Sequence, residues 1–285
     1  MTQRPEIQKM QARLRSALSD AAVLQLVRGD LLHTFSQLGL KQEAPAVIER
    51  MLATLRDTTD IEATEAQIYA ELQQLRVGTL SLTQILDAKM QQRAAIIYGQ
   101  VAPFFKSDAT IIDWGCGDGQ VTNLIAKHIT HKIEGYDVRK YPAPGLAISI
   151  TQFDGQTIPV GFGHFEAGLM TNVAHHEVDN SRILRELSRI IRSGGRLVVI
   201  ETVPIKDDPT EFERTFIGDY VYNRLFHQSD IPVPGTYETE AGWVKRFAAA
   251  GFELEKFKKI TNPTPLGYDQ PTIRDWHTRL VFRRQ

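Results

Sequence analysis

The most constraining feature of this 285-residue chain is a glycine-rich loop that directly follows a short apolar strand. The run Thr110-Ile111-Ile112-Asp113 predicts the strand, and Trp114-Gly115-Cys116-Gly117-Asp118-Gly119 leads into a predicted helix over 119–130. Alternate glycines let the backbone turn tightly and approach a ligand closely, where any side chain would collide. The helix points its positive N-terminal end at the same place. The segment therefore predicts a ligand-binding strand–loop–helix unit of an α/β fold.

Strands and helices alternate through the rest of the chain after residue 90. The predicted strands are 132–137, 147–150, 166–171 and 196–201, and a helix over 181–192 ends at Ser193-Gly194-Gly195. A helix over 240–250 and two closing strands, 252–260 and 278–284, follow a longer insertion. This alternation predicts right-handed crossovers and a mostly parallel, doubly wound sheet with an antiparallel edge hairpin.

The first third of the chain has a different composition. Its only glycines and prolines up to residue 90 are Gly29, Gly39, Gly78, Pro5 and Pro45. Few helix breakers, together with many Ala, Leu, Gln, Glu and Arg residues, predict a helical region. The predicted organisation is therefore a helical cap over 1–85 and an α/β domain over 86–285, with a lid insertion over 204–239.

Charge and cysteine content restrict the partners and the compartment. With 33 Lys and Arg against 34 Asp and Glu, the formal net charge is −1, which removes the global basic field typical of nucleic-acid binding. The single cysteine, Cys116, cannot form an intrachain disulfide. The N-terminus lacks the apolar run of a signal peptide, and no apolar stretch reaches about 18 residues. We expect a cytoplasmic protein that does not associate with membranes.

The segment IIDWGCGDG resembles the first motif, hhDxGxGxG, of class I S-adenosylmethionine (SAM)-dependent methyltransferases. Asp137, at the end of the second predicted strand, matches the family's ribose-binding acid, and Asp154 more weakly matches its acid near the adenine. The run Thr171-Asn172-Val173-Ala174-His175-His176 resembles the N-V-L-H-H that is frequent in small-molecule methyltransferases of the methyltransferase-11 type, with Ala174 in place of Leu. The resemblance covers 110–201 well and 240–285 loosely.

The resemblance implies a Rossmann-like sheet of seven strands in the order 3-2-1-4-5-7-6, with an α-helical N-terminal cap. It also implies SAM as the cofactor and S-adenosylhomocysteine as the product. Lys89, Arg93 and Tyr98, on the helix entering the first strand, could reach the methionine carboxylate, although the two cations have a simpler interpretation as solvated helix residues. The implied cofactor-binding residues are Asp113, Gly115, Cys116, Gly117, Gly119, Asp137, Val138, Asp154, Gly155, Asn172, Arg93 and Tyr98.

His175 and His176 are the candidate acid/base residues, because imidazole titrates near neutrality. The alternative is that the pair is a structural signature, with one ring bonded to the backbone and the other exposed. A metal site is the least favoured interpretation, since adjacent side chains do not easily converge on one ion. Glu201 and Thr202 do not resemble the Asp-Asn pair of magnesium-dependent catechol methyltransferases. We predict no metal.

The insertion contains a second candidate surface. Phe216, Tyr220, Asn223 and His227 share one face if 212–227 is a helix. Two aromatic rings with an amide and an imidazole suit a substrate pocket, which makes Tyr220 and His227 further catalytic candidates. The competing interpretation is an amphipathic helix packed on the domain.

The preferred function is methyl transfer from SAM to an oxygen, nitrogen or carbon atom of a small molecule in a capped pocket. One alternative is an RNA or protein methyltransferase; the absence of an N/D-P-P-Y tetrapeptide and the near-zero charge argue against it. Another is a non-catalytic SAM-fold interaction module, against which the intact loop and Asp137 argue. The N-terminal helices are also candidates for a homodimer interface.

Overall fold

The computed structural model describes residues 5–139, 141–228, 231–261 and 276–285. These residues divide into two compact units. We call residues 5–90 and 204–237 the helical unit, and residues 91–203, 238–261 and 276–285 the sheet unit. Within the described ranges, no helix has the length and apolarity needed to cross a membrane.

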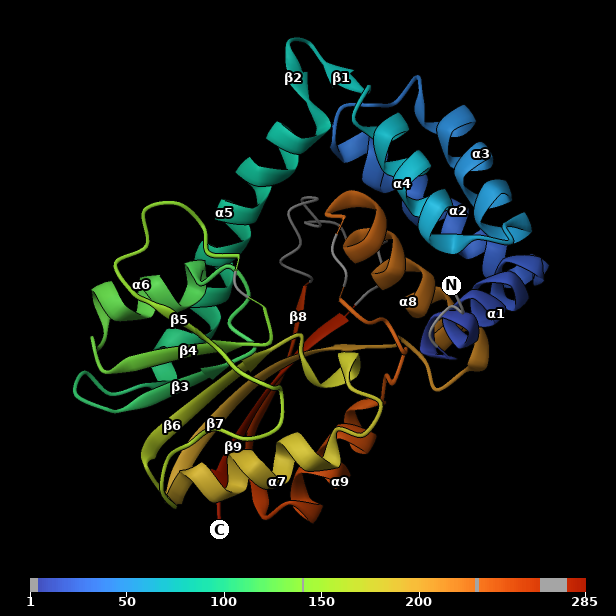
Figure 1. The fold of residues 1–285 in the computed structure, drawn as a ribbon. Helices are drawn as coiled ribbons and strands as arrows, with labels where there is room; N and C mark the ends of the chain where they lie inside the picture. The colour runs from blue at the N-terminus through green and yellow to red at the C-terminus, as the bar shows by residue number, and fades with distance from the viewer. Residues whose placement is uncertain (1–4, 140, 229–230, 262–275) are drawn as a thin grey trace. The chain divides into compact units, whose positions relative to one another are not determined.

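The helical unit begins as predicted, with helices whose starts are capped by acidic side chains. Asp20 accepts hydrogen bonds from the N–H groups of Ala22 and Val23, and Asp60 accepts one from Ala63. A hairpin of two short strands, which the sequence did not predict, precedes the long helix α5 (Figure 1). The elements are α1 (Pro5–Ser19), α2 (Ala21–Gln37), α3 (Ala44–Asp57), α4 (Ile61–Leu72), β1 (Arg76–Val77), β2 (Leu80–Ser81) and the first half of α5 (Leu82–Val101).

The insertion after the fifth strand of the sheet completes this helical core. It forms α8 (Pro209–Tyr220), capped by Asp208, and continues as a π-helix, η3 (Val221–Phe226). Helix α8 packs against α1 and α2, and η3 packs against α4. The side chains of Phe216, Ile217 and Tyr220 are completely buried in the same cluster as the apolar residues of α1 to α4. Residues 5–90 and 204–237 therefore share one core.

The sheet unit confirms the predicted fold class. Its described residues form a seven-stranded sheet in the order β5-β4-β3-β6-β7-β9-β8 (Figure 1), which is the predicted order 3-2-1-4-5-7-6. The strands β3 to β7 pair in parallel, whereas β9 is antiparallel to β7 and β8. The strands are β3 (Ile111–Trp114), β4 (Ile133–Asp137), β5 (Ile150–Gln152), β6 (Phe165–Thr171), β7 (Ile191–Val203), β8 (Phe252–Thr261) and β9 (Trp276–Arg284).

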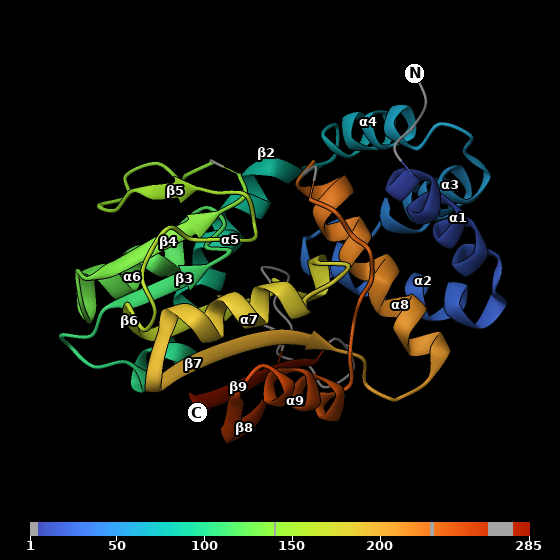
Figure 2. The same cartoon turned by 60° about the horizontal axis from the view of Figure 1, so that its bottom comes forward.

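Helices cover both faces of this sheet. Helix α6 (Gln120–His128) and the second half of α5 pack on one face, where Ile97, Ile125 and Ile111 share a cluster. Helices α7 (Ser181–Ile190) and α9 (Glu240–Ala249) pack on the other, which comes forward in Figure 2, through Leu187 and Trp243. The parallel strands are therefore buried on both faces, and their carboxyl ends form the edge at which ligands bind in such sheets.

Of the element boundaries that differ from the predictions, two have a clear physical reason. The third strand starts at Ile150 instead of Ala147, because the N–H of Ala147 donates to the Asn123 side chain of α6 rather than to the strand ladder (2.8 Å). Helix α7 ends at Ile190 rather than residue 192, because Ile191 already pairs with Phe165. The residues between Ile191 and Arg196, including the predicted glycine stop, form an irregularity at the start of β7.

Candidate functional site

The glycine-rich loop links β3 to α6 at the carboxyl edge of the sheet. Gly115, Gly117 and Gly119 have φ values of 72°, 58° and 78°, a region that L side chains rarely adopt. A Cβ atom at Gly115 would lie 2.4 Å from a methyl carbon of Val173, so the loop also packs closely against the segment that follows β6. The predicted need for glycine at these positions is explained by this geometry.

Asp113 lies beneath the loop as a fully buried carboxyl group with a free acceptor. Its Oδ2 accepts a hydrogen bond from the Thr122 hydroxyl at 2.6 Å, whereas Oδ1 has no partner among the described residues. Burial raises the pKa of this carboxyl, and the nearby charge of Asp137 contributes in the same direction. The resulting pKa is about 7. A buried oxygen without a donor is costly, so the site suits a ligand that brings a donor or a positive charge.

Asp137 ends β4 beside the same loop. Its Oδ2 accepts the N–H of Gly117 at 2.8 Å, and its Oδ1 accepts the N–H of Arg139 at 3.0 Å. Burial raises the pKa of this carboxyl, although these backbone bonds oppose the effect. Two carboxyl groups with raised pKa values thus lie under and beside one loop, which is the arrangement expected at a binding site for a cationic ligand.

Three further predicted cofactor-binding residues, Val138, Asp154 and Gly155, have different surroundings in the structure. Val138 is exposed, and a Cβ atom at Gly155 would come within 2.9 Å of it, so these residues adjoin each other next to Asp137. The carboxylate of Asp154, by contrast, accepts the N–H groups of Gln156 and Thr157 at 2.8 and 2.9 Å. It therefore stabilises a turn, and these bonds lower its pKa.

Asn172 was predicted from the motif after the fourth strand, and Arg93 and Tyr98 from their helix before the first strand. Asn172 has a φ of 55°, donates its N–H to Ile200 at 2.7 Å and keeps a buried Oδ1 that no described residue binds. The Nε of Arg93 is likewise buried with no partner in the described ranges. The ring of Tyr98 lies 5.8 Å from that of His128, at the end of α6 opposite the glycine loop, so the structure does not bring Tyr98 to the loop.

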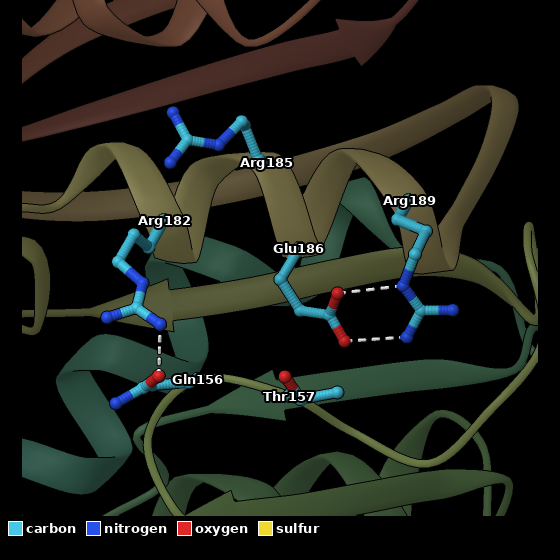
Figure 3. A pocket seen from close by; sticks show the side chains of 6 residues that line it. All are labelled: Gln156, Thr157, Arg182, Arg185, Glu186 and Arg189. Carbon is cyan, nitrogen blue, oxygen red and sulfur yellow. Dashed lines mark hydrogen bonds and ion pairs between the residues drawn. The ribbon is translucent and has the colours of Figure 1, made fainter.

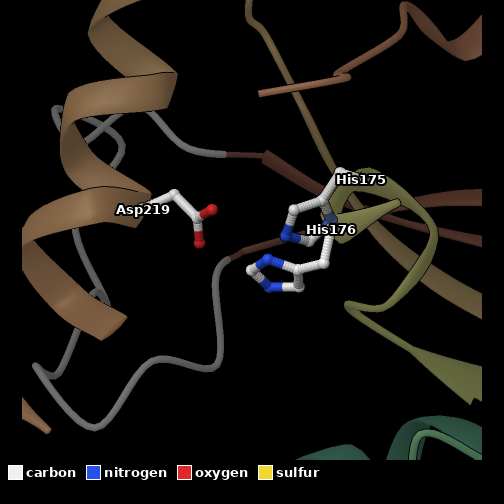
Figure 4. A group of neighbouring side chains, drawn as sticks. All are labelled: His175, His176 and Asp219. Carbon is white, nitrogen blue, oxygen red and sulfur yellow. The ribbon is translucent and has the colours of Figure 1, made fainter. Parts of the chain in front are cut away.

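His175 and His176 lie in a short 3-10 turn directly after β6, with ring centroids 4.2 Å apart (Figure 4). His175 is 1% exposed, and its Nδ1 lies 2.5 Å from Oε2 of Glu201, which is completely buried at the end of β7. The other oxygen, Oε1, accepts the N–H groups of Val173 and Ala174 at 3.0 and 2.7 Å. Because a carboxylate only accepts, Nδ1 carries a proton and donates it to Glu201, so Nε2 is the basic nitrogen whenever the imidazole is neutral.

The contact between His175 and Glu201 was not predicted from the sequence, in which Glu201 was considered only as a possible metal ligand. The available signal was the register: Thr171 pairs with Ile200 in the parallel ladder, which places the residues that follow the two strands side by side. The alternative interpretation had one histidine ring bonded to the backbone, whereas the Nδ1 atom of His175 contacts a carboxylate.

The two candidates in the insertion lie in the helical unit. Tyr220, which was predicted to line a pocket, has its side chain buried in the helical core, and its hydroxyl donates to Glu65 at 2.5 Å. Burial raises its pKa well above the usual value. His227 follows η3, with its ring 4.6 Å from that of Tyr222. The third side chain in Figure 4, Asp219, also belongs to this unit and accepts hydrogen bonds from Asn223 and Tyr237.

A shallow pocket of about 290 Å³, which the sequence did not predict, lies on α7 (Figure 3). Glu186 pairs with Arg189 at 2.6 Å, and Arg189 also donates to the carbonyl groups of Ile158 and Val160. These arginine contacts hold the preceding loop on the helix. The pocket is lined by Gln156, Thr157, Arg182, Arg185, Glu186 and Arg189.

Comparison with known proteins agrees with this geometry. Residues 112–199 match the family model of a methyltransferase domain, of the methyltransferase-11 type. Norreticuline-7-O-methyltransferase from Papaver somniferum is 28% identical over 163 residues, which are 53% of this chain and 42% of that protein. The chain thus spans less than half the length of this curated relative.

Solved structures share the fold at low sequence identity. The [4+2]-cyclase SpnF is 18% identical with a TM-score of 0.51, over 66% of this chain and 80% of that one. Geranyl diphosphate methyltransferase, in complex with GPP and sinefungin, is 15% identical with a TM-score of 0.50, over 68% and 77%. Because one of these neighbours is a cyclase, the shared fold alone does not determine the reaction.

Proposed function

We propose that the protein transfers a methyl group from SAM to a small-molecule acceptor, supported by the match of residues 112–199 to the family model of a methyltransferase domain. The observation that carries this proposal is the buried, unpartnered Oδ1 of Asp113 beneath a loop of three glycines with positive φ. SAM is a cation with an ammonium group, so it supplies the charge and the donors that this loop lacks.

The residues at the loop fit such a cofactor. Gly115 and Gly117 would lie against its methionine portion, where a side chain has no room. Asp113, which lies beneath the loop, would attract the positive charge of the cofactor. Asp137 would bind the ribose hydroxyls. Val138 and Gly155 adjoin each other beside Asp137 and would border the adenine. The bound cofactor supplies an electrophilic methyl group, and the chain has to hold it in line with the acceptor.

We assign proton removal from the acceptor to His175. Glu201 fixes Nδ1 as the protonated nitrogen, so Nε2 can take a proton from a hydroxyl or ammonium group of the acceptor. Burial of both side chains orients the imidazole and strengthens its bond to the carboxylate. His176 remains a second candidate because its ring lies next to that of His175.

Two named relatives support a small-molecule acceptor. Norreticuline-7-O-methyltransferase and geranyl diphosphate methyltransferase are named for small molecules. The formal charge of −1 agrees with this class better than with nucleic acid. The acceptor atom, and the roles predicted for residues 1–85 as a substrate cap or homodimer interface, stay predictions.

Calorimetry with SAM and S-adenosylhomocysteine tests the cofactor assignment. Asp137→Ala should weaken both affinities by at least about tenfold, since hydrogen bonds to a charged group contribute about 1.5–3 kcal/mol. Asp108→Asn is the matched control, because Asp108 is an exposed acid before β3, at the opposite end of that strand. Absence of binding to the unaltered protein, or equal affinity of the Asp137 variant, would reject the proposal. Methyl-labelled SAM incubated with a metabolite extract would then identify the acceptor.

A further inference from the structure

The connection between β4 and β5 is unusual for parallel strands. Such strands are ordinarily joined by a crossover helix, but residues 138–149, as far as they are described, contain neither helix nor strand. The loop instead crosses the N-terminal end of α6. The N–H of Ala143 donates to the Asp118 carbonyl at 2.9 Å, and that of Ala147 donates to the Asn123 side chain at 2.8 Å. Two separate bonds therefore hold this loop over the glycine loop.

Tyr141 is the side chain that this loop brings to the predicted cofactor site. Its hydroxyl lies 3.4 Å from the position that a Cβ atom would take on Gly117. Burial raises the pKa of the phenol, and the nearby charges of Asp137 and Asp118 raise it as well. The hydroxyl therefore lies beside the ribose-binding acid proposed above and stays protonated at neutral pH.

The environment of Tyr141 leaves its hydroxyl available to a ligand. No hydrogen bond to it occurs among the described residues, although its neighbours are charged. The residue is 45% exposed, so a ligand can reach it from solvent. A protonated phenol can donate to an uncharged oxygen, whereas a ligand carboxylate would be repelled by Asp137 and Asp118.

We propose that Tyr141 is a cofactor-binding residue that donates its phenol hydrogen to a ribose hydroxyl over Gly117. This inference rests on the proposed function. It assigns to the β4–β5 loop the role of completing the cofactor site: Asp137 accepts a hydrogen bond from the ribose, and Tyr141 donates one to it.

The test compares the affinity of S-adenosylhomocysteine for the full chain, Tyr141→Phe and Tyr136→Phe. Tyr136 is the matched control, because its hydroxyl donates to Glu134 and the adjacent Asp137 points to the other face of β4. Loss of one hydrogen bond should raise the Kd of the Tyr141 variant by about three- to tenfold. The control should bind like the unaltered protein.

A second probe locates the contact on the nucleoside. Methylthioadenosine carries the ribose but not the amino acid, so Tyr141→Phe should weaken its binding by the same factor. Equal or tighter binding of S-adenosylhomocysteine by this variant would overturn the inference, and so would an effect absent with methylthioadenosine. Failure of the unaltered protein to bind either ligand would instead reject the proposed function.

Discussion

Glu201 and His175 form a buried pair at the ends of β7 and β6, with 2.5 Å between Oε2 and Nδ1. The carboxylate accepts two backbone N–H groups on its other oxygen, so its position is fixed from two sides. A charge buried this completely is stabilised only when its partners are in place. The pair therefore sets both the orientation and the tautomer of the imidazole.

Glu201→Gln should reverse the tautomer of His175. The amide keeps an oxygen for Val173 and Ala174 but turns its NH2 group to Nδ1, which must then accept, so that Nε2 carries the proton and cannot act as a base. We expect turnover to fall by about 10²-fold or more, within the range for general-base catalysis, with unchanged affinity for S-adenosylhomocysteine. Nitrogen NMR of the imidazole and steady-state turnover measure the two effects. Glu253→Gln, an exposed acid on β8, is the control.

Replacing the two adjacent histidines should have unequal effects. His175→Ala leaves the Glu201 carboxylate without a donor at Oε2, so we expect a large loss of turnover and a lower melting temperature. The same substitution at His176 should cost at least tenfold less turnover, because His176 is half-buried whereas His175 is completely buried against Glu201. Turnover and thermal unfolding of both variants check this order. Full activity in both would remove any acid/base role from the pair.

Asp113 should make stability depend on pH. Its pKa is about 7 in the folded protein, against an ordinary value of 3.8 for an exposed aspartate, so between these pH values the unfolded chain holds fewer protons at this group. The protonated carboxyl therefore stabilises the fold at low pH, and this contribution is lost as pH rises through about 7. Asp113→Asn, which keeps an oxygen for Thr122, should lack this dependence. The difference in unfolding free energy between the two proteins, measured by urea at pH 5 and pH 7.5, should change by at most about 1.4 kcal/mol per pH unit. If the difference in unfolding free energy were the same at both pH values, the raised pKa of Asp113 would be contradicted.

Local patterns predicted most of the sheet unit. An apolar run, a glycine loop and an amphipathic helix each depend on a few neighbouring residues, and the strand order followed from the family resemblance. The contact between Glu201 and His175 depends instead on the pairing of two strands, which periodicity does not report. The loop between β4 and β5 is as long as a crossover connection, so its length did not indicate that its described residues form no helix.

The insertion shows the limit of helical periodicity. The spacing of Phe216 and Tyr220 correctly indicated one face of a helix, since both lie in α8. It could not indicate what covers that face. Apolar residues of α1 to α4 do so, and Glu65, 155 residues away from Tyr220 in sequence, accepts its hydroxyl. A pocket wall and a buried core face have the same sequence pattern.

Removing residues 1–85 alone should therefore prevent folding of the remaining chain. Phe216, Ile217 and Tyr220 would lose the apolar residues that bury them, and buried Arg214 would lose its ion pair with Asp30. We expect aggregation, seen by size-exclusion chromatography. If 204–237 is also replaced by a short Gly-Ser linker, the sheet unit should fold and bind S-adenosylhomocysteine. Its ends lie close enough for such a linker, because Glu240 accepts a hydrogen bond from Thr278, which pairs with Glu201 in the sheet. A soluble, ligand-binding product of the single deletion would show that the two segments do not depend on a shared core.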